Sequence, residues 1–165
     1  MNPPIQIRRA LPADAEAITS IYNEAILTTT ATFDTVPKTT AERLEWLAAH
    51  DQRHPVLVAI LEGKAVGWAS LTKWSDRPAY DDTAETSFYV KSECRGQGIG
   101  RMLKEAIIEE ARTLHFHTLI ARVAEGSQES LHLNESAGFE HVGTMKQVGK
   151  KFGKLLDVHI MQKML

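Results

Sequence analysis

The sequence predicts an α/β fold in which a mixed central β-sheet is flanked by helices. Segments with strand composition alternate with amphipathic segments of helical period along the whole chain. In the second half, a strand at residues 84–90, a glycine-rich loop and a helix precede another strand at 118–123. This last run is apolar enough to be buried on both sheet faces. A strand–helix–strand crossover therefore surrounds the glycine-rich loop.

The first elements follow from local patterns. Residues 5–8 alternate in polarity and predict a strand. Pro12, followed by acidic residues, predicts the start of a helix. Residues 27–38 contain five threonines and Phe33, and predict a loop. The buried face of the first helix is expected to consist of Ile18, Ile21, Tyr22, Ala25 and Ile26.

A second helix is predicted from a capping signal. Thr39 and Glu42 have the spacing of a capping box, and Leu44 and Leu47 are expected to face inward. Two strands are then predicted at 55–61 and 65–71, with a turn at 62–64 between them.

The end of the chain adds a short helix and two strands. The helix is predicted at 127–137, with Gly138 as the residue that ends it. Strands are expected at about 140–148 and 155–161, on either side of 149–154. The complete order is strand, helix, helix, three strands, helix, strand, helix, two strands.

The glycine-rich loop carries the first functional signal. Gly96, Gly98 and Gly100 stand at the start of a helix, where backbone N–H groups are unpaired and the helix dipole favours negative charge. A diphosphate group is the expected ligand of this loop. Arg101 replaces the third glycine of a dinucleotide-binding motif, and no Gly-Lys-Ser/Thr follows, so the Rossmann and Walker patterns are both excluded. A glycine-rich turn without a ligand is the alternative.

The helix after the loop has one apolar stripe. It is expected to bury Ile99, Leu103, Ala106, Ile107, Ala111 and Leu114. Four charged residues are expected to lie largely off this stripe: Lys104, Glu105, Glu109 and Arg112.

Composition limits the class of protein. At 165 residues, with 43% hydrophobic and 24% charged residues, the chain suits a single domain over 1–165. The net charge of −2 gives no basic footprint for nucleic acid. No apolar run is long enough to span a membrane, and the start, Met1–Pro4, does not resemble a signal peptide. A single cysteine, Cys94, fits a reducing compartment, so we expect a cytoplasmic protein.

The sequence gives little support for a metal site or for a nucleophilic cysteine. His115 and His117 are separated by one residue at a predicted helix–strand junction, and no other cluster is assigned ligand spacing, so no metal site is expected. Cys94 has no evident histidine partner and is expected to be inert.

Arg95-x-x-Gly98-x-Gly100, directly after a strand, resembles the pyrophosphate loop of the GNAT superfamily of N-acetyltransferases. The predicted element order is similar to the GNAT order over nearly the whole chain. Two longer strings, Trp74 to Val90 and Gln147 to Asp157, resemble the phosphinothricin and methionine sulfoximine N-acetyltransferase branch.

This resemblance implies a GNAT fold, acetyl-CoA as co-substrate and a small amino-acid analogue as acceptor. Members of this branch acetylate the α-amino group of phosphinothricin, methionine sulfoximine or methionine sulfone by direct attack. Glu85 matches the glutamate that acts as base, because an ammonium group must lose a proton before it can attack. A strand-end carboxylate with a structural hydrogen bond is the alternative for Glu85.

The resemblance also implies cofactor-binding residues. Strand backbone would meet the thioester and pantetheine, the glycine loop would hold the phosphates, and Ser127 and Asn134 would contact the cofactor from the late helix. Asn134 occupies the position of a tyrosine or histidine general acid, and an amide cannot donate that proton at ordinary pH. His132 is expected at the surface. The cofactor residues are Phe88, Tyr89, Val90, Arg95, Gly96, Gln97, Gly98, Ile99, Gly100, Arg101, Ser127 and Asn134.

Substrate residues are expected upstream of Glu85 and near the C-terminus. A guanidinium can hold a carboxylate with two hydrogen bonds, which favours Arg77 as the partner of the acceptor's carboxylate. Packing of the loop by its own aromatic residues is the alternative. The complete set is Phe33, Trp74, Arg77, Tyr80, Thr83, Lys151 and Phe152. A homodimer is expected, and Lys151 and Phe152 would complete the pocket either in the same chain or from the neighbouring subunit.

Two other functions are compatible with the sequence. A GNAT enzyme could use an aminoglycoside, a polyamine or a protein N-terminus as acceptor, although the near-neutral charge disfavours strongly cationic acceptors. The second alternative is an acyl-CoA-binding module with weak catalysis, because Asn134 cannot act as the general acid. Release of free thiol distinguishes this module from the enzymes.

Overall fold

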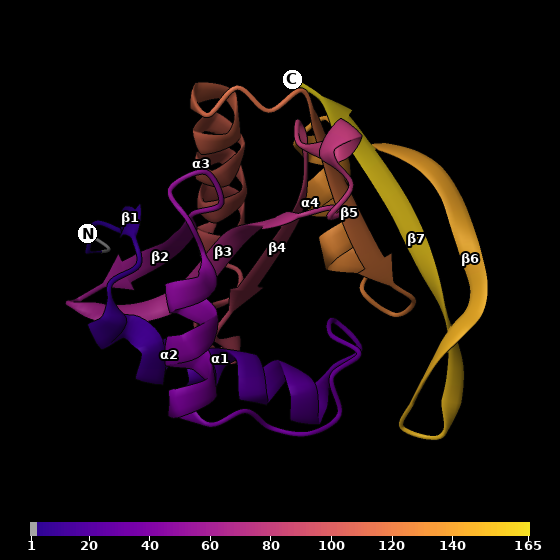
Figure 1. Cartoon of the computed structure of the whole chain (residues 1–165). Coiled ribbons are helices and arrows are strands. Elements are labelled where there is room, and N and C mark those ends of the chain that lie inside the picture. The colour runs from indigo at the N-terminus through magenta and orange to yellow at the C-terminus, as the bar shows by residue number, and fades with distance from the viewer. Residues whose placement is uncertain (1–2) are drawn as a thin grey trace.

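The computed structural model describes residues 3–165. The expectation about the chain's start falls partly on Met1 and Asn2, which lie outside the described residues. A seven-stranded sheet in the order β1-β2-β3-β4-β5-β7-β6 forms the centre of the fold (Figure 1). The observed order of helices and strands is the predicted one, and the sheet is mixed as expected.

The strands and helices have clear bounds. The strands are β1 Gln6–Arg9, β2 Val56–Leu61, β3 Lys64–Lys73, β4 Thr83–Val90, β5 Thr118–Ala124, β6 Glu140–Lys151 and β7 Lys154–Met164. The α-helices are α1 Ala15–Thr28, α2 Thr40–Ala49, α3 Ile99–Thr113 and α4 Gln128–Ser136. Short 3₁₀ turns occupy Pro12–Asp14, Pro78–Tyr80 and Ser92–Cys94.

Pairing in the sheet is antiparallel except between its two central strands. β1 to β4 pair in sequence, and β5 pairs with β7, which pairs with β6. The parallel pair is β4 with β5, joined by the crossover through α3. The glycine-rich loop lies in this connection, between β4 and α3.

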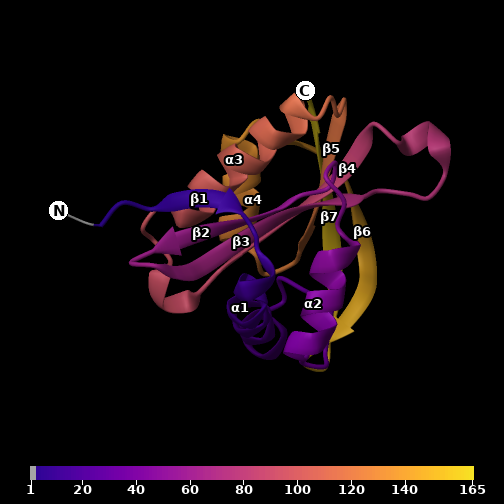
Figure 2. The ribbon, with the colours of Figure 1, turned by 60° about the vertical axis from the view of Figure 1, so that its left-hand side comes forward.

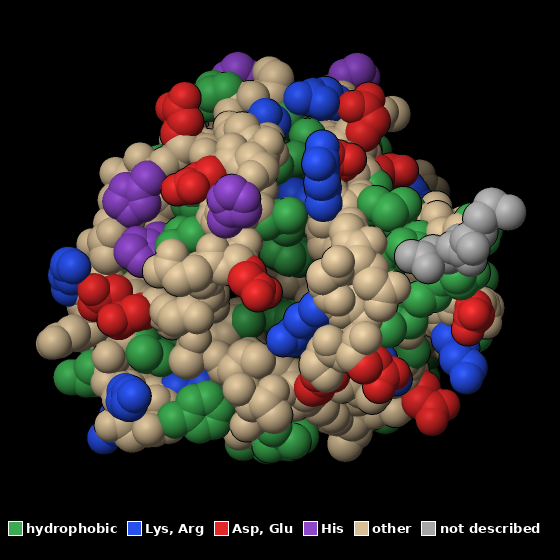
Figure 3. Space-filling model, turned by 180° about the vertical axis from the view of Figure 1, so that it is seen from behind, with side chains coloured by type: hydrophobic (Ala, Val, Ile, Leu, Met, Phe, Trp, Pro, Cys, Tyr) green, Lys and Arg blue, Asp and Glu red, His purple; other side chains and the backbone are tan. Residues whose placement is uncertain are grey.

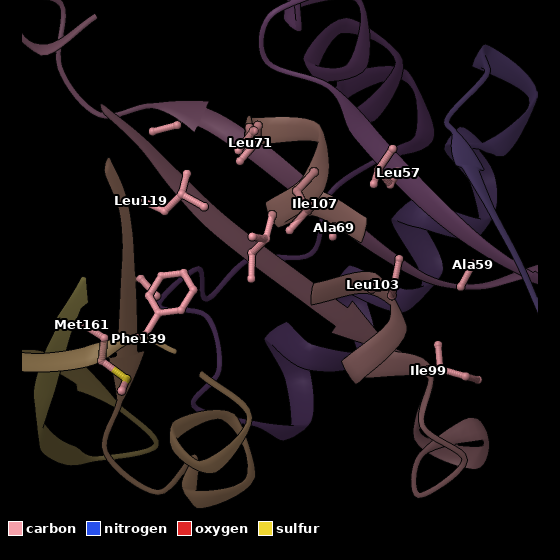
Figure 4. Packing of buried hydrophobic residues seen from close by; sticks show 14 of the residues in the cluster. Leu57, Ala59, Ala69, Leu71, Ile99, Leu103, Ile107, Leu119, Phe139 and Met161 are labelled. Carbon is pink, nitrogen blue, oxygen red and sulfur yellow. The ribbon is translucent and has the colours of Figure 1, made fainter. Parts of the chain in front are cut away.

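Helices cover both faces of the sheet. Figure 2 shows α1 and α2 on one face and α3 and α4 on the other. The α3 side holds the larger core, in which helix residues such as Leu103 and Ile107 pack on strand residues such as Leu71 (Figure 4). The α1 side holds a smaller core around Ile18 and Trp68. Fully burying one such aliphatic side chain stabilises the fold by about 1.5–3 kcal/mol.

Several local signals are confirmed. The Thr39 side chain accepts a hydrogen bond from Glu42 N, and Thr39 N donates to the Glu42 carboxylate, which completes the capping box. Gly138 follows the last residues of α4 with φ +86°, as expected for the residue that ends a helix. His132 is exposed.

The expectation for Leu44 is wrong. Leu44 is 41% exposed, and its neighbour Arg43 is buried instead. The Arg43 guanidinium lies 3.8 Å from the centroid of the Tyr22 ring and 5.5 Å from that of Trp68. α2 therefore presents a cation to an aromatic cluster rather than a leucine to an aliphatic core. Burial lowers the pKa of Arg43.

The expectation for Lys104 is also wrong. Lys104 is 1% exposed, and Ile108, one turn further along α3, is buried as well. The apolar face of α3 is wider than one stripe, because the helix contacts both the sheet and α4.

The two last strands are longer than predicted. β6 runs to Lys151 and β7 begins at Lys154, so the connection is the two-residue turn Phe152-Gly153, with φ +51° and +74°. The hairpin curves away from the body of the sheet (Figure 1). On the face seen in Figure 3, basic and acidic side chains are interspersed.

Candidate active site

Strands β4 and β5 separate after a short pairing. β4 pairs with β5 only from Thr83 to Glu85, opposite residues 118–120. Beyond that point β4 continues beside β3 to Val90, and β5 continues beside β7 to Ala124. Within residues 3–165 the facing edges have no sheet partner, so their backbone groups are available to a ligand. An extended ligand with amide groups can pair with such an edge.

The loop between β4 and α3 has the backbone that an anion site requires. Gly96 and Gly98 have φ of +73° and +81°, which glycine adopts without strain. Gly98 is the N-cap of α3, and no acidic residue lies in the first turn of this helix. A Cβ at either glycine would meet nothing within 4 Å, so the space beside the loop is open. The positive end of the helix dipole and its free N–H groups face this space.

A cavity of about 580 Å³ extends from the glycine loop to the separated strands. Most of the residues predicted to bind the cofactor line it: Phe88, Tyr89, Val90, Arg95, Gly96, Gly98, Ile99, Gly100, Arg101 and Ser127. Gln97 does not line this cavity, and Asn134 lines a smaller one that adjoins it.

Two arginines lie at this cavity. Arg95 Nε donates to the carbonyl oxygen of Val90 at 3.2 Å. Arg101 Nε donates to Glu105 at 2.7 Å, which raises the pKa of Arg101. Both side chains are exposed, so each cation can reach a phosphate without leaving a buried site.

The smaller cavity, of about 50 Å³, forms an inner extension. Lys104, Thr86, Arg122 and Asn134 bound it. Asn134 is 1% exposed; its Nδ2 donates to the carbonyl oxygen of Ser130 at 2.8 Å, and its Oδ1 has no partner. The residues shared with the larger cavity are Ala31, Phe88, Tyr89, Ser127 and Ser130.

Glu85 is the last β4 residue paired with β5, at the apex of the separation. Both of its carboxylate oxygens accept hydrogen bonds from Arg122, at 2.6 and 2.8 Å. The Glu85 side chain is 14% exposed and that of Arg122 is 52% exposed. The hydrogen bonds to Glu85 raise the pKa of Arg122. The carboxylate is therefore oriented, and it keeps lone pairs for a further donor.

Of the predicted substrate residues between β3 and β4, Trp74 lies near this pair. The Trp74 ring centroid is 5.9 Å from the Arg122 guanidinium carbon, and Thr83 begins β4. Tyr80 is 44% exposed. Arg77 is exposed, and its guanidinium makes no hydrogen bond or ion pair to any of residues 3–165.

The remaining predicted substrate residues join the loop after α1 to the last hairpin. A Cβ on Gly149 would lie 2.2 Å from the Phe33 ring, so glycine permits the close approach of this aromatic residue. Lys151 is 4% exposed, and its ammonium donates to the carbonyl oxygens of Thr29 and Thr32, both at 2.7 Å. Burial lowers the pKa of Lys151. Phe152 is exposed at the hairpin turn.

Sequence reasoning missed two residues of this region. Arg122 is a single charged residue in an otherwise apolar strand, and that interruption was the available signal. Lys104 precedes Ile108 by one helical turn, and this apolar neighbour indicated a wider buried face.

The geometry fits an elongated acyl-coenzyme A. The free strand edges can pair with pantetheine amides, and the glycine loop with α3 can hold the diphosphate. Among the described residues no group of acidic, histidine or cysteine side chains could hold a metal ion. None of the helices in residues 3–165 is both long and apolar enough to cross a bilayer.

Comparison with known proteins gives the family. A profile of the acetyltransferase (GNAT) domain matches residues 7–160. The chain is 40% identical over 158 residues to an L-methionine sulfoximine/L-methionine sulfone acetyltransferase of Pseudomonas paraeruginosa, covering 94% of this chain and 92% of that one.

Two solved structures are similar throughout. A ribosomal-protein-alanine N-acetyltransferase from Brucella melitensis has a TM-score of 0.94 at 43% identity, covering 97% of this chain and 99% of that one. A phosphinothricin acetyltransferase from Sinorhizobium meliloti, in complex with acetyl-CoA, has a TM-score of 0.92 at 34% identity, covering 98% of this chain and 88% of that one.

The chain belongs to the GNAT family of N-acetyltransferases. It has the GNAT fold, and it is an enzyme that uses acetyl-CoA as its acetyl donor.

Proposed function

We propose that this enzyme acetylates the α-amino group of a small amino-acid analogue of the methionine sulfoximine, methionine sulfone or phosphinothricin type. The similarity to acetyltransferases with these acceptors supports the proposal. The observation that carries it is the position of Glu85, at the apex where β4 and β5 separate. A base at this position meets the acceptor where the open strand edge ends.

The predicted cofactor and base residues divide the work in this proposal. Bound acetyl-CoA supplies an activated thioester. The backbone of Phe88 to Val90 orients it, Arg95 to Arg101 bind its diphosphate, and Ser127 and Asn134 contact it from α4. Glu85 accepts the proton that the acceptor's ammonium must lose, directly or through water. Arg122 holds the Glu85 carboxylate in one orientation.

Arg77 is proposed to bind the acceptor's carboxylate. Its guanidinium is unpaired among the described residues, whereas that of Arg122 already holds Glu85. Trp74, Tyr80, Thr83, Phe33 and Phe152 would form the walls of the acceptor site. Lys151 would act indirectly, because its ammonium ties the loop of Phe33 to the hairpin.

An acceptor screen that follows free thiol tests this function. Methionine sulfoximine, methionine sulfone and phosphinothricin should give higher kcat/KM than polyamines, aminoglycosides or peptides. A four-way comparison then tests Arg77, using wild type and Arg77→Ala with methionine sulfoximine and its decarboxylated analogue. Each single change should lower kcat/KM by a factor that corresponds to about 2–3 kcal/mol of lost transition-state stabilisation, the scale of a charged hydrogen bond. Combining both changes should add little, and additive losses would exclude Arg77 as the partner.

A protein N-terminus is the second candidate acceptor. The 43% identity to a ribosomal-protein-alanine N-acetyltransferase supports it. A peptide that begins with alanine belongs in the same screen. If it exceeds every free amino acid in kcat/KM, the small-acceptor proposal is wrong.

We propose further that one domain spans residues 1–165 and that the protein is a cytoplasmic homodimer. Apolar side chains along the β6–β7 hairpin favour a second copy as partner, because such exposed groups are stabilised by burial. They are Val142, Met145, Val148, Phe152 and Leu155, each at least 40% exposed. Light scattering should give a mass near twice 18.4 kDa, and Val148→Glu should lower it toward the monomer.

A further inference from the structure

Lys104 places a cation at the inner end of the active site. Its ammonium donates to Thr86 Oγ1 at 2.7 Å and lies 4.0 Å from the centroid of the Phe139 ring. The side chain is 1% exposed to solvent, and it bounds the cavity of about 50 Å³ that adjoins the acetyl-CoA cavity. Asn134, whose Oδ1 is buried without a partner, bounds the same cavity.

No carboxylate in the described part of the chain neutralises this ammonium. Within residues 3–165, Lys104 makes no ion pair. The side chains that face it are Thr86 and Phe88 from β4, Asn134 from α4, Phe139 before β6, and Lys163 from β7. Of these only Lys163 is charged, and it has the same sign. Burial first and Lys163 second lower the pKa of Lys104 to about 7.

A buried, unpaired ammonium is unfavourable for the fold, and an apolar residue would pack at this position of α3 without that penalty. Ionisable groups in such surroundings concentrate at functional sites. Among the described residues that line the cavity, no other side chain can both carry a proton and release it near neutral pH. Asn134 is an amide, Arg122 stays charged, and burial raises the pKa of Tyr89.

We propose that Lys104 is the acid that protonates the coenzyme A sulfur as it leaves, with Thr86 holding its ammonium at the inner cavity that Asn134 also lines. The acceptor's nitrogen forms the new C–N bond as the C–S bond breaks and its electron pair goes to sulfur. Lys104 then loses one N–H proton, and sulfur gains it. The acceptor's ammonium loses one proton to Glu85 before the attack, and Glu85 passes it to solvent. The nitrogen loses its second proton to Glu85 as the C–N bond forms, and the neutral lysine regains a proton from solvent after product release.

The acid strengths favour this transfer. A free thiol has a pKa of about 8.5, so a group with a pKa of about 7 gives its proton to a thiolate favourably. A lysine with its ordinary pKa of about 10.4 would give it up unfavourably. The environment of Lys104 therefore converts a base into a suitable acid.

Titration of bound coenzyme A tests the proposal without any acceptor. Thiolate absorbance gives the thiol pKa in the binary complex. It should be at least one unit lower with wild type than with Lys104→Met, a tenfold or larger change in the thiolate ratio. Arg112→Met removes an exposed cation from the same helix and should match wild type. Equal thiol pKa values in wild type and Lys104→Met would overturn the proposal.

Nitrogen NMR of the lysine side chains gives a second readout on the unaltered protein, so it decides even if Lys104→Met folds poorly. Coenzyme A should move the Lys104 signal, and desulfo-coenzyme A, which lacks only the thiol, should leave it close to its free position. Identical shifts with both ligands would show that the ammonium does not face the sulfur. Because no acceptor is present, neither result depends on the proposed acceptor class.

Discussion

Arg122 donates two hydrogen bonds to Glu85, from Nε to Oε1 at 2.6 Å and from Nη2 to Oε2 at 2.8 Å. The two residues belong to the two parallel strands at the centre of the sheet, and they meet where these strands separate. The pair therefore lies where the proposed cofactor cleft begins, and it contains the proposed base. We propose that the pair orients the Glu85 carboxylate, since an ion pair with one half-exposed partner contributes only about 0–1 kcal/mol to stability.

Replacing the base should affect rate more than fold. Glu85→Gln keeps the size of the side chain and loses its basicity, so turnover near neutral pH should fall by about 10²–10⁴. At high pH the turnover of Glu85→Gln should approach that of wild type, because the free amine of the acceptor is abundant there. Steady-state kinetics from pH 6 to 10 measure this, and a mutant within threefold of wild type throughout would remove Glu85 from the role.

Loss of Arg122 should reduce catalysis while leaving stability almost unchanged. Arg122→Gln removes the two-point contact, so kcat should fall tenfold or more while the free energy of unfolding changes by less than about 1 kcal/mol. In the double mutant with Glu85→Gln the two losses should not add, because both changes break the same contact. Additive losses would mean that Arg122 acts independently of Glu85.

A side chain at Gly98 should abolish cofactor binding. Saturating wild type with acetyl-CoA at a hundredfold over its Kd should add about 2.7 kcal/mol, a rise in Tm of roughly 5–10 °C. Gly98 has φ +81°, so Gly98→Val strains the loop and fills the space where the phosphates would lie.

Gly63→Val is the matched control for Gly98→Val. Gly63 has φ +76°, and a Cβ there also meets nothing within 4 Å, but it lies in the turn between β2 and β3. Both variants should lose similar stability, and only Gly98→Val should lose the acetyl-CoA shift. If Gly98→Val keeps the full shift, the cofactor binds elsewhere.

The buried charge of Lys104 should make stability depend on pH. Its pKa in the folded protein is about 7, against 10.5 as the ordinary value, so the unfolded chain binds more protons between these limits. The penalty is complete below pH 7 and is relieved as pH rises toward 10.5, by about 1.4 kcal/mol per unit. Lys104→Met should therefore be more stable than wild type at pH 7, with the difference shrinking by pH 9. Denaturant titrations at both values measure it, and a constant difference would contradict the shift.

The sequence determined the element order, the glycine loop and the capping of α2, because each depends on a local pattern. Alternating polarity sets the strands, a Thr-x-x-Glu spacing sets the start of α2, and glycines mark positive φ before α3. For the wide buried face of α3, and with it Lys104, the sequence offered only the signal of Ile108 one turn later, since the extent of burial depends on what packs against the helix from two directions.

Tertiary structure alone decided how the candidate active site is built. Glu85 and Arg122 are 37 residues apart, and they meet because β4 and β5 pair in parallel for three residues and then separate. Lys151 reaches carbonyl oxygens of Thr29 and Thr32 more than a hundred residues away. No periodicity encodes such contacts, because they depend on strand register and on where pairing stops. The sequence determined which residue types were available for the chemistry, and the packing of the sheet determined which of them became buried, paired or free.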